Sequence, residues 1–289
     1  MAKPEIVDFL VIGAQKCATT WIHTILDQHP DIFVPAIKEV HYFNYAKNYN
    51  RGLEWYGPIM TPPDDAMLVG ECTPNYFWNY QTEHERQGPN HIGDIAGKVK
   101  QVNPEAKFIL VLRNPVDRAV SAYFHHIGQG TIRPDAGIQN SMHLYGIFSM
   151  GLYVKHLEHW LQHFPQDRFL TLIYERDIAI KSNNEDTIQR IYRHIGAAPF
   201  NDIVFDKARN RRNSYFFMWS TRFIRPASLP GKVLKRLAPK LIPKNLDESF
   251  KPVVTPEDYA ALDALYQPYN KTLGELTGQD VTRWWGSRE

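Results

Sequence analysis

A glycine, a lysine and two threonines stand close together near the start of the chain, in the stretch FLVIGAQKCATTWIHTIL that begins at Phe9. A glycine loop between an apolar strand and a helix is typical of phosphate sites, because the first amides of a helix are unpaired donors. In the nucleotide-binding loop G-x-x-x-x-G-K-[ST] the lysine follows six positions after the first glycine. Here Lys16 follows Gly13 by only three positions, which indicates a phosphate-like group that is gripped differently.

The residues of this first loop have both binding and packing interpretations. Thr19 and Thr20 offer hydroxyl donors, Lys16 offers a full positive charge, and the amides from Cys17 onward can wrap an anion. The alternatives are that a threonine simply caps the helix and that Lys16 is solvated. Cys17 at a helix start beside a lysine can have a lowered pKa, but a small packed side chain is the simpler interpretation.

A second loop repeats this pattern in FILVLRNPVDRAVSAYFHH. Arg113 stands at the end of an apolar strand, and Ser121 lies two helical turns into the helix that follows. Arginine grips phosphate with two hydrogen bonds, and a serine hydroxyl can complete the cradle. The alternative is a surface ion pair of Arg113 or Arg118 with Asp117.

Strands and helices alternate along the chain, which predicts an α/β fold with a central parallel sheet flanked by helices. Ligands in such folds sit at the carboxyl ends of the strands, where both loops fall. The apolar runs predict strands over residues 9–12, 67–70 and 107–112 and within DRFLTLIYERD (residues 167–177). Helix start and stop signals predict helices over residues 20–28 and 115–126, and a further helix is expected over 185–194. Apolar residues spaced three and four apart predict helices over residues 151–164 and 255–276.

The 289 residues can bury a full core, and without a low-complexity linker they predict one domain over residues 1–289. Residues 207–244 hold eleven Lys or Arg and no Asp or Glu, although the net charge of the chain is only +2. We therefore treat 207–250 as a basic region on the cofactor or acceptor side. This region is expected either to contact an anionic surface, a membrane or an acidic glycan, or to be a solvated lid. Pro226, Pro230 and Pro239 are expected to limit any continuous helix there.

Two cysteines, Cys17 and Cys72, do not make a disulfide framework, and no apolar run has the length of a membrane span. The acids Glu5 and Asp8 precede the first apolar run, which argues against a secretory signal. These features predict a soluble, cytoplasmic protein, with peripheral membrane association through the basic segment as an option. No nucleic-acid partner is expected.

Taken together, the two loops resemble those of sulfotransferases that use 3'-phosphoadenosine 5'-phosphosulfate (PAPS). GAQKCATTWI is similar to the 5'-phosphosulfate loop of that family, and LVLRNPVDRAVSAYFHH is similar to its 3'-phosphate motif. KEVHYFN, GLEWYGPIM and GECTPNYFWN resemble the heparan sulfate (N-/3-O-) sulfotransferase branch in order and spacing. The resemblance covers most of the chain and implies a three-layer P-loop-like fold, PAPS as donor, 3',5'-diphosphoadenosine as product and no metal.

The resemblance also implies roles for single residues. Glu39 of KEVHYFN occupies the place of the general base, and His41 is a partner of the base, a substitute for it or a structural histidine. Lys16 would lie beside the bond that breaks and stabilise the leaving phosphate. The residues expected to bind the donor are Gln15, Lys16, Cys17, Ala18, Thr19, Thr20, Trp21, Arg113, Ser121, Tyr174, Arg211, Arg212 and Asn213.

The acceptor is less well defined by the sequence. A hydroxyl or amine of a carbohydrate or glycolipid is expected, although Cys72 stands where the animal heparan sulfate enzymes usually have lysine. Those enzymes carry a membrane anchor, whereas eight residues precede the first strand here, so a bacterial-type cytoplasmic enzyme is expected. The alternatives are a nucleotide-dependent kinase, disfavoured because Ala18 and Thr19 stand where G-K is required, and a non-catalytic module that binds anions or a membrane surface.

Overall fold

The computed structural model describes residues 6–64, 67–79, 92–205 and 214–286. Its contacts divide the chain into two compact units. The first consists of Met1–Asn114, Leu152–Asp206 and Pro268–Glu289, and the second of Pro115–Gly151 and Lys207–Gln267. The single domain over 1–289, with 207–250 as a basic region, stays a prediction.

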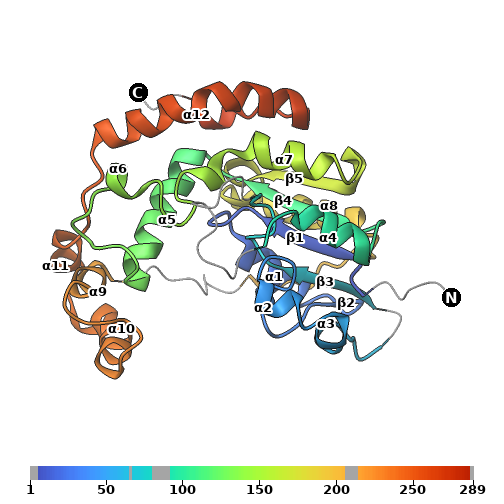
Figure 1. Ribbon diagram of the computed structural model, residues 1–289, viewed down its shortest axis with the longest axis horizontal. Coiled ribbons are helices and arrows are strands. Elements are labelled where there is room, and N and C mark those ends of the chain that lie inside the picture. Colours follow the sequence, from blue (N-terminus) through green and yellow to red (C-terminus); the bar gives the residue numbers. More distant parts are fainter. Residues whose placement is uncertain (1–5, 65–66, 80–91, 206–213, 287–289) are drawn as a thin grey trace. The chain divides into compact units, whose positions relative to one another are not determined.

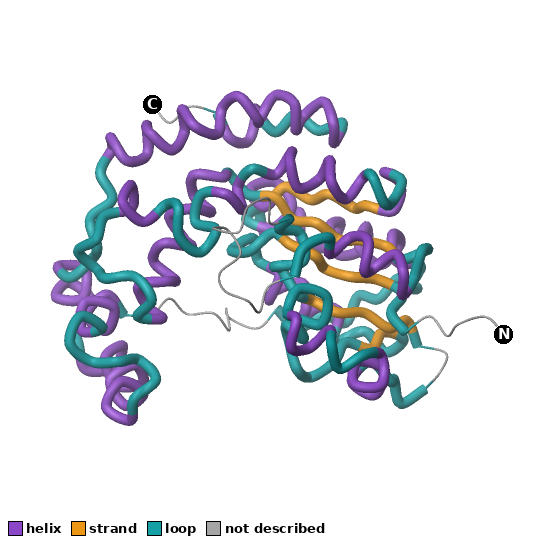
Figure 2. The backbone as a smooth tube through the Cα atoms, viewed as in Figure 1, coloured by secondary structure: helices purple, strands orange, loops and turns teal. Residues whose placement is uncertain are grey.

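The first unit is built on a parallel sheet, whose strands lie side by side in Figure 1 and are drawn in orange in Figure 2. The strand order within the described residues is β2-β3-β1-β4-β5, and every neighbouring pair is parallel. The strands are β1 Phe9–Gly13, β2 Ile32–Phe33, β3 Leu68–Cys72, β4 Lys107–Leu112 and β5 Phe169–Ile173. The predicted α/β class with a helix-flanked parallel sheet is confirmed.

The central strands form because their sequences are uninterrupted apolar runs. All five residues of β1 are buried, and so are five of the six residues of β4. Strands of a parallel sheet that are covered on both faces require this composition. The run at 107–112 predicted β4 correctly, whereas β3 extends two residues beyond the predicted 67–70 because it includes the buried acid Glu71.

Helices alternate with the strands, and the five helices predicted from the sequence are present as α1, α5, α7, α8 and α12. Asp94 caps α4, its side chain accepting a hydrogen bond from the amide of Gly97. The helices are α1 Thr19–Leu26, α2 Ala46–Tyr49, α3 Leu53–Ile59, α4 Ile95–Val102, α5 Pro115–Gln129, α6 Ile138–Ser141, α7 Tyr153–Leu161, α8 Asn184–Ile195, α9 Tyr215–Ser220, α10 Leu229–Leu241, α11 Lys244–Ser249, α12 Pro256–Thr277 and α13 Thr282–Trp285.

The expectation that prolines limit a helix in the basic segment is wrong for α10. Pro230 lies in the first turn of this helix, where a missing N–H costs no intrahelical bond. Pro239 lies near its end, and the helix stops two residues later. The hydroxyl of Ser228 caps the helix by accepting from the amide of Gly231, at 3.2 Å.

The strand order defines where the direction of chain winding reverses. The chain leaves β1 toward β2 and β3 on one side and then returns to β4 on the other. In open α/β sheets the crevice at the carboxyl ends of two such strands is where ligands bind. The loops that follow β1 and β4 are the two loops predicted to bind an anion.

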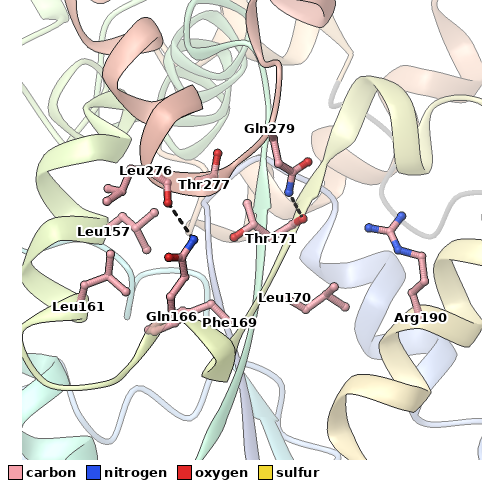
Figure 3. A pocket seen from close by; sticks show the side chains of 10 residues that line it. All are labelled: Leu157, Leu161, Gln166, Phe169, Leu170, Thr171, Arg190, Leu276, Thr277 and Gln279. Carbon is pink, nitrogen blue, oxygen red and sulfur yellow. Dashed lines mark hydrogen bonds between the residues drawn. The ribbon is translucent and has the colours of Figure 1, made fainter.

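A cavity of about 190 Å³ lies among α7, β5 and the C-terminal segment of the first unit (Figure 3). Gln166 donates to the carbonyl of Leu276 at 2.9 Å, and Gln279 donates to the carbonyl of Thr171 at 2.7 Å. None of the predicted site residues lines this cavity. It is also smaller than the ~300–1,000 Å³ of typical ligand pockets, so we assign it to packing.

Candidate active site

The first loop is shaped by close packing at its start. A Cβ atom on Gly13 would lie 2.7 Å from Cβ of Phe77, so only glycine fits there. The amide of Ala14 then donates to the carbonyl of Val111 at 2.8 Å, which ties the loop to β4. Lys16 and Ala18 adopt left-handed backbone conformations, with φ of 70° and 65°. Such residues in a turn before a helix form the concave arrangements of N–H groups that bind anions.

The start of α1 has no side-chain cap. Ala18 is the N-cap residue, so the interpretation of Thr19 or Thr20 as a helix cap is wrong. An uncapped first turn leaves donors and a partial positive charge for an anion. Cys17 is fully buried, with its thiol 3.9 Å from the hydroxyl of Tyr153, so it packs as a small side chain.

Arg113 joins the two predicted loops. Its guanidinium donates to the carbonyl of Lys16 at 3.4 Å and lies 5.0 Å from the centre of the Tyr174 ring, a cation–π distance. The hydroxyl of Tyr153 donates to the carbonyl of Arg113 at 2.9 Å and holds the end of β4. The predicted donor-site residues Lys16, Arg113 and Tyr174 are thus brought together.

Two buried polar atoms in these loops have no hydrogen-bond partner among the described residues. They are Nε of Arg113 and Oε1 of Gln15. Buried polar atoms are nearly always paired, and an orphaned guanidinium nitrogen beside an uncapped helix start is a donor set suited to an anionic ligand. The residues present therefore fit a phosphate-bearing nucleotide.

Glu39 and His41 lie on the segment between β2 and α2, both with left-handed backbone conformations. The Glu39 carboxylate forms an ion pair with Lys38 and lies 3.7 Å from Nε2 of His41. Its side chain is 37 % exposed, so it is accessible to an acceptor. The predicted base and its predicted partner are therefore neighbours.

His41 is held on two sides. Its Nδ1 lies 3.1 Å from Oδ1 of Asn44, and its ring stacks on Tyr45 at 4.3 Å. Burial lowers the pKa of His41, while the charge of Glu39 and the bond to Asn44 act in the opposite direction. The imidazole is therefore neutral near pH 7 and can accept a proton.

Glu71 supports this segment, a role that the sequence reasoning left open. Its carboxylate is fully buried, and burial raises its pKa. The hydroxyl of Tyr76 donates to this carboxylate and accepts a hydrogen bond from the amide of Tyr42 at 2.8 Å. Glu71 and Tyr76 therefore support the backbone next to the two candidate catalytic residues. The hydroxyls that donate to Glu71 are those of Tyr56 at 2.6 Å, Thr73 at 2.5 Å and Tyr76 at 2.8 Å.

Cys72 relates the Glu39 segment to the sheet. Burial raises the pKa of its thiol, and the charges of Lys38 and Glu39 also act on it. Cys72 ends β3 and pairs in register with Val11 of β1. The segment that carries Glu39 is therefore near the carboxyl edge of the sheet, where the first loop begins.

The other predicted residues have different outcomes. Trp21 is half-buried on α1, and Ser121 is half-buried on α5, in the second compact unit, where its part in the site stays a prediction. Arg211, Arg212 and Asn213 lie outside the described residues. Sequence reasoning missed Glu175, which accepts from the amide of Asn114 and from the indole of Trp285, both at 2.9 Å.

In the described part of the chain, no helix combines the length and the apolar character that a membrane span needs. The solved structure of a sulfotransferase from Alicyclobacillus acidocaldarius superimposes with a TM-score of 0.60 at 19% identity, covering 96% of this chain and 98% of the other. This similarity agrees with the fold described above.

Sequence comparison identifies the family. Human heparan sulfate glucosamine 3-O-sulfotransferase 6 is 29% identical over 287 residues, covering 96% of this chain and 73% of the relative. Mouse heparan sulfate glucosamine 3-O-sulfotransferase 3A1 is 27% identical over 286 residues, covering 94% of this chain and 63% of the relative. The resemblance to the heparan sulfate branch is confirmed. Because the sulfotransferase domain model also matches residues 7–277, the chain belongs to the sulfotransferase family.

Proposed function

We propose that this sulfotransferase transfers the sulfuryl group of PAPS to a hydroxyl group of a carbohydrate acceptor, free or in a glycolipid. The observation that carries the proposal is the position of Arg113, which bonds to the first loop and keeps a buried, unpaired Nε. That nitrogen is a donor for a phosphate oxygen of the nucleotide. Lys16, the loop amides and the uncapped start of α1 supply the remaining positive charge.

In the proposed reaction, the acceptor oxygen forms a bond to sulfur while the bond from sulfur to the bridging oxygen breaks. The electron pair of that bond goes to the 5'-phosphate of the departing 3',5'-diphosphoadenosine. Lys16 stabilises the negative charge that grows on the bridging oxygen. As in phosphoryl transfer, most of the rate enhancement comes from positioning and electrostatics.

Glu39 is the proposed general base and takes the proton of the acceptor hydroxyl. Its exposed carboxylate is available to an acceptor and is held in place by the ion pair with Lys38. His41 is the proposed partner of Glu39, because its Nε2 lies 3.7 Å from the carboxylate and burial keeps the imidazole neutral.

The proposed acceptor class is supported by the relatives, which are named as 3-O-sulfotransferases of heparan sulfate glucosamine. This favours a hydroxyl over an amine and a sugar over a phenol. Cys72 replaces a lysine that is usual in the animal enzymes, so we do not extend the proposal to heparan sulfate itself. The family match leaves the kinase and non-catalytic alternatives without support.

The test is a transfer assay with radiolabelled PAPS, with ATP in parallel, against a panel of glycans, glycolipids and phenols. We expect label from PAPS on one or more sugar acceptors and none from ATP. Lys16→Ala and Glu39→Gln should each reduce the transfer by about a hundredfold or more, while both variants keep the thermal shift on binding 3',5'-diphosphoadenosine. Transfer that is unchanged in Lys16→Ala, or transfer from ATP alone, would overturn the assignment.

A further inference from the structure

A cluster of one carboxylate and two imidazoles lies in the first unit, outside the proposed donor site. Asp94 is the N-cap of α4, and its Oδ1 is oriented by the amide of Gly97 at 3.1 Å. His159 and His163 stand four residues apart, the first on α7 and the second in the turn that follows it. Residues four apart on a helix share one face, so both imidazoles face the same carboxylate.

The distances in this cluster match those of a metal centre. Nε2 of His159 and of His163 lie 3.3 Å and 3.2 Å from Oδ1 of Asp94, and the three ligand atoms all lie within 4.8 Å of one another. Zinc bonds to histidine nitrogen and carboxylate oxygen are about 2.0–2.2 Å long, so tetrahedral ligands are separated by roughly 3.3 Å. Two of the three separations therefore already have the required length, and the third, between the two imidazole nitrogens, is at most 4.8 Å.

The surroundings of the cluster permit a cation. Lys98 on α4 donates its ammonium to the carbonyl oxygens of Gly93 and Asp94 and also attracts the Asp94 carboxylate, so a bound ion would share that carboxylate with it. The C-terminal end of α7 contributes a partial negative charge that offsets the opposite charge at the start of α4. The imidazoles are 19% and 25% exposed and the carboxylate is 55% exposed, which leaves a path for an ion and for a completing water.

From this geometry we infer a binding site for a divalent transition metal of the zinc class, held by Asp94, His159 and His163. Two histidines four residues apart with a carboxylate are ligands that zinc, nickel and copper accept. The ion would connect α4 to α7. The alternative to metal binding is that the two imidazoles donate hydrogen bonds directly to the Asp94 carboxylate.

The experiment is isothermal titration of tag-free, chelator-treated protein with Zn²⁺, together with the absorption spectrum of Co²⁺ bound in its place. We expect one ion per chain, a rise in melting temperature, and the visible bands of tetrahedral cobalt. His163→Ala and Asp94→Asn should each weaken binding by more than about tenfold, whereas His143→Ala, at an exposed histidine outside the cluster, should not. Absence of stoichiometric binding, or binding unchanged in the two cluster variants, would overturn the inference.

A second, independent observation concerns α10 in the other unit, labelled in Figure 1. Its small residues Gly231 and Ala238 are buried, while four of its five large apolar residues are exposed and the fifth, Leu234, is half-buried. A Cβ on Gly231 would lie 2.2 Å from the carbonyl oxygen of Arg225, so the helix packs closely on the preceding turn through its glycine. This is the reverse of a helix that buries its large side chains. The exposed fractions are 77% for Leu229, 48% for Val233, 39% for Leu237 and 69% for Leu241.

The exposed apolar residues recur every four positions and form one stripe. At 3.6 residues per turn they fall within about 120° of arc, and the exposed cations of the helix occupy an arc that adjoins this stripe and overlaps one edge of it. No Asp or Glu occurs between Asp206 and Asp247, so these charges have no acidic partner within their own segment. The cations are Lys232, Lys235, Arg236 and Lys240.

We propose that α10 is an interfacial helix that docks on an anionic lipid membrane. Interfacial helices bury an apolar stripe in the headgroup region and place Lys and Arg among the anionic headgroups. An acidic glycan would use the cations and leave the four apolar side chains in water, so the stripe favours a lipid. This proposal does not depend on the nature of the sulfuryl acceptor.

The test is flotation of the protein with vesicles of phosphatidylcholine alone and with added phosphatidylglycerol, at low salt. We expect binding only to the anionic vesicles, lost in Val233→Ser/Leu237→Ser and, separately, in Lys235→Glu/Arg236→Glu. Leu265→Ser, at an exposed leucine of α12, is the matched control. Absence of binding to anionic vesicles, or binding that the Val233→Ser/Leu237→Ser variant retains, would overturn the proposal. If no variant changed flotation and the Val233→Ser/Leu237→Ser variant still bound to heparin, α10 would be assigned to an acidic glycan.

Discussion

The guanidinium of Arg113 and the main-chain carbonyl of Lys16 are joined by a hydrogen bond of 3.4 Å. These residues are 97 positions apart, and their contact connects the loops that follow β1 and β4 at the carboxyl edge of the sheet. The bond occupies one guanidinium nitrogen and leaves the buried Nε for a ligand. A lysine has a single nitrogen, so it cannot place one donor on the carbonyl of Lys16 and another at the position of Nε.

Arg113→Lys is therefore expected to weaken binding of 3',5'-diphosphoadenosine by about ten- to a hundredfold, because a charge-assisted hydrogen bond contributes roughly 1.5–3 kcal/mol. Isothermal titration measures the change. Arg133→Lys is the control, since Arg133 is exposed and its guanidinium pairs with the nearby Asp135. Equal affinity of the Arg113→Lys variant and the wild type would refute the role of Arg113.

Lys16→Ala is expected to lower kcat by about a hundredfold to a thousandfold, the usual effect of removing a group that stabilises transition-state charge. Affinity for the diphosphoadenosine product should fall much less, because the loop amides and Arg113 remain. Steady-state kinetics with the best acceptor and titration of the product separate the two effects. A variant that lost only affinity would place Lys16 in binding and not at the bond that breaks.

Glu39→Gln is expected to reduce transfer by about a hundredfold or more, since general bases contribute that much. The substitution keeps the shape of the side chain, so melting temperature and donor binding should remain close to those of the wild type. Glu54→Gln, at an exposed glutamate of α3, is the matched control. If His41→Gln abolished transfer and Glu39→Gln did not, the two roles would have to be exchanged.

Glu71→Ala is expected to destabilise the protein by several kcal/mol. The substitution removes the acceptor of three buried hydroxyl groups, and each hydrogen bond to a charged or buried group contributes about 1–3 kcal/mol. Denaturant unfolding measures the loss, with Glu158→Ala at an exposed position of α7 as the control. A free energy of unfolding within about 0.5 kcal/mol of the wild type would mean that the hydrogen bonds to Glu71 do not stabilise the fold.

Burial of His41 predicts a pH dependence of stability. Because the pKa of His41 is lowered in the folded protein, the unfolded chain binds a proton there first as the pH falls through about 6.5. Stability should therefore decrease from pH 7.5 toward pH 5.5, and part of the decrease should disappear in His41→Gln. Burial also lowers the pKa of His159 and His194, so only part of the slope is expected to be lost. An unchanged slope of melting temperature against pH in His41→Gln would contradict this.

Much of the fold was predictable because its central strands are buried on both faces and read as apolar runs. β4 was predicted to the residue, and the helices α7 and α12 were located from their apolar spacing. Elements with weak patterns were missed, among them the two-residue β2 and the short α4. The continuous helix α10 was missed because its prolines lie at tolerated positions near its two ends.

The candidate site was predictable to the level of its loops but not of its supports. The spacing of Gly13, Lys16 and Arg113 indicated anion binding without any knowledge of distances. By contrast, Glu71 and Glu175 act through partners far apart in the sequence, Tyr56 and Trp285 among them, and no local pattern encodes such contacts. Only the folded chain brings these residues together.

The discontinuity of the first unit has a consequence for how the protein is made on the ribosome. Glu175, just after β5, accepts a hydrogen bond from the indole of Trp285, and the carbonyl of Thr171 accepts one from Gln279. Each contact therefore forms only after a partner about 110 positions later in the chain has been synthesised. A chain synthesised at about 5–20 residues per second spends several seconds between these positions. The contacts of Thr171 and Glu175 with the C-terminal segment therefore form only after the rest of the sheet has been synthesised.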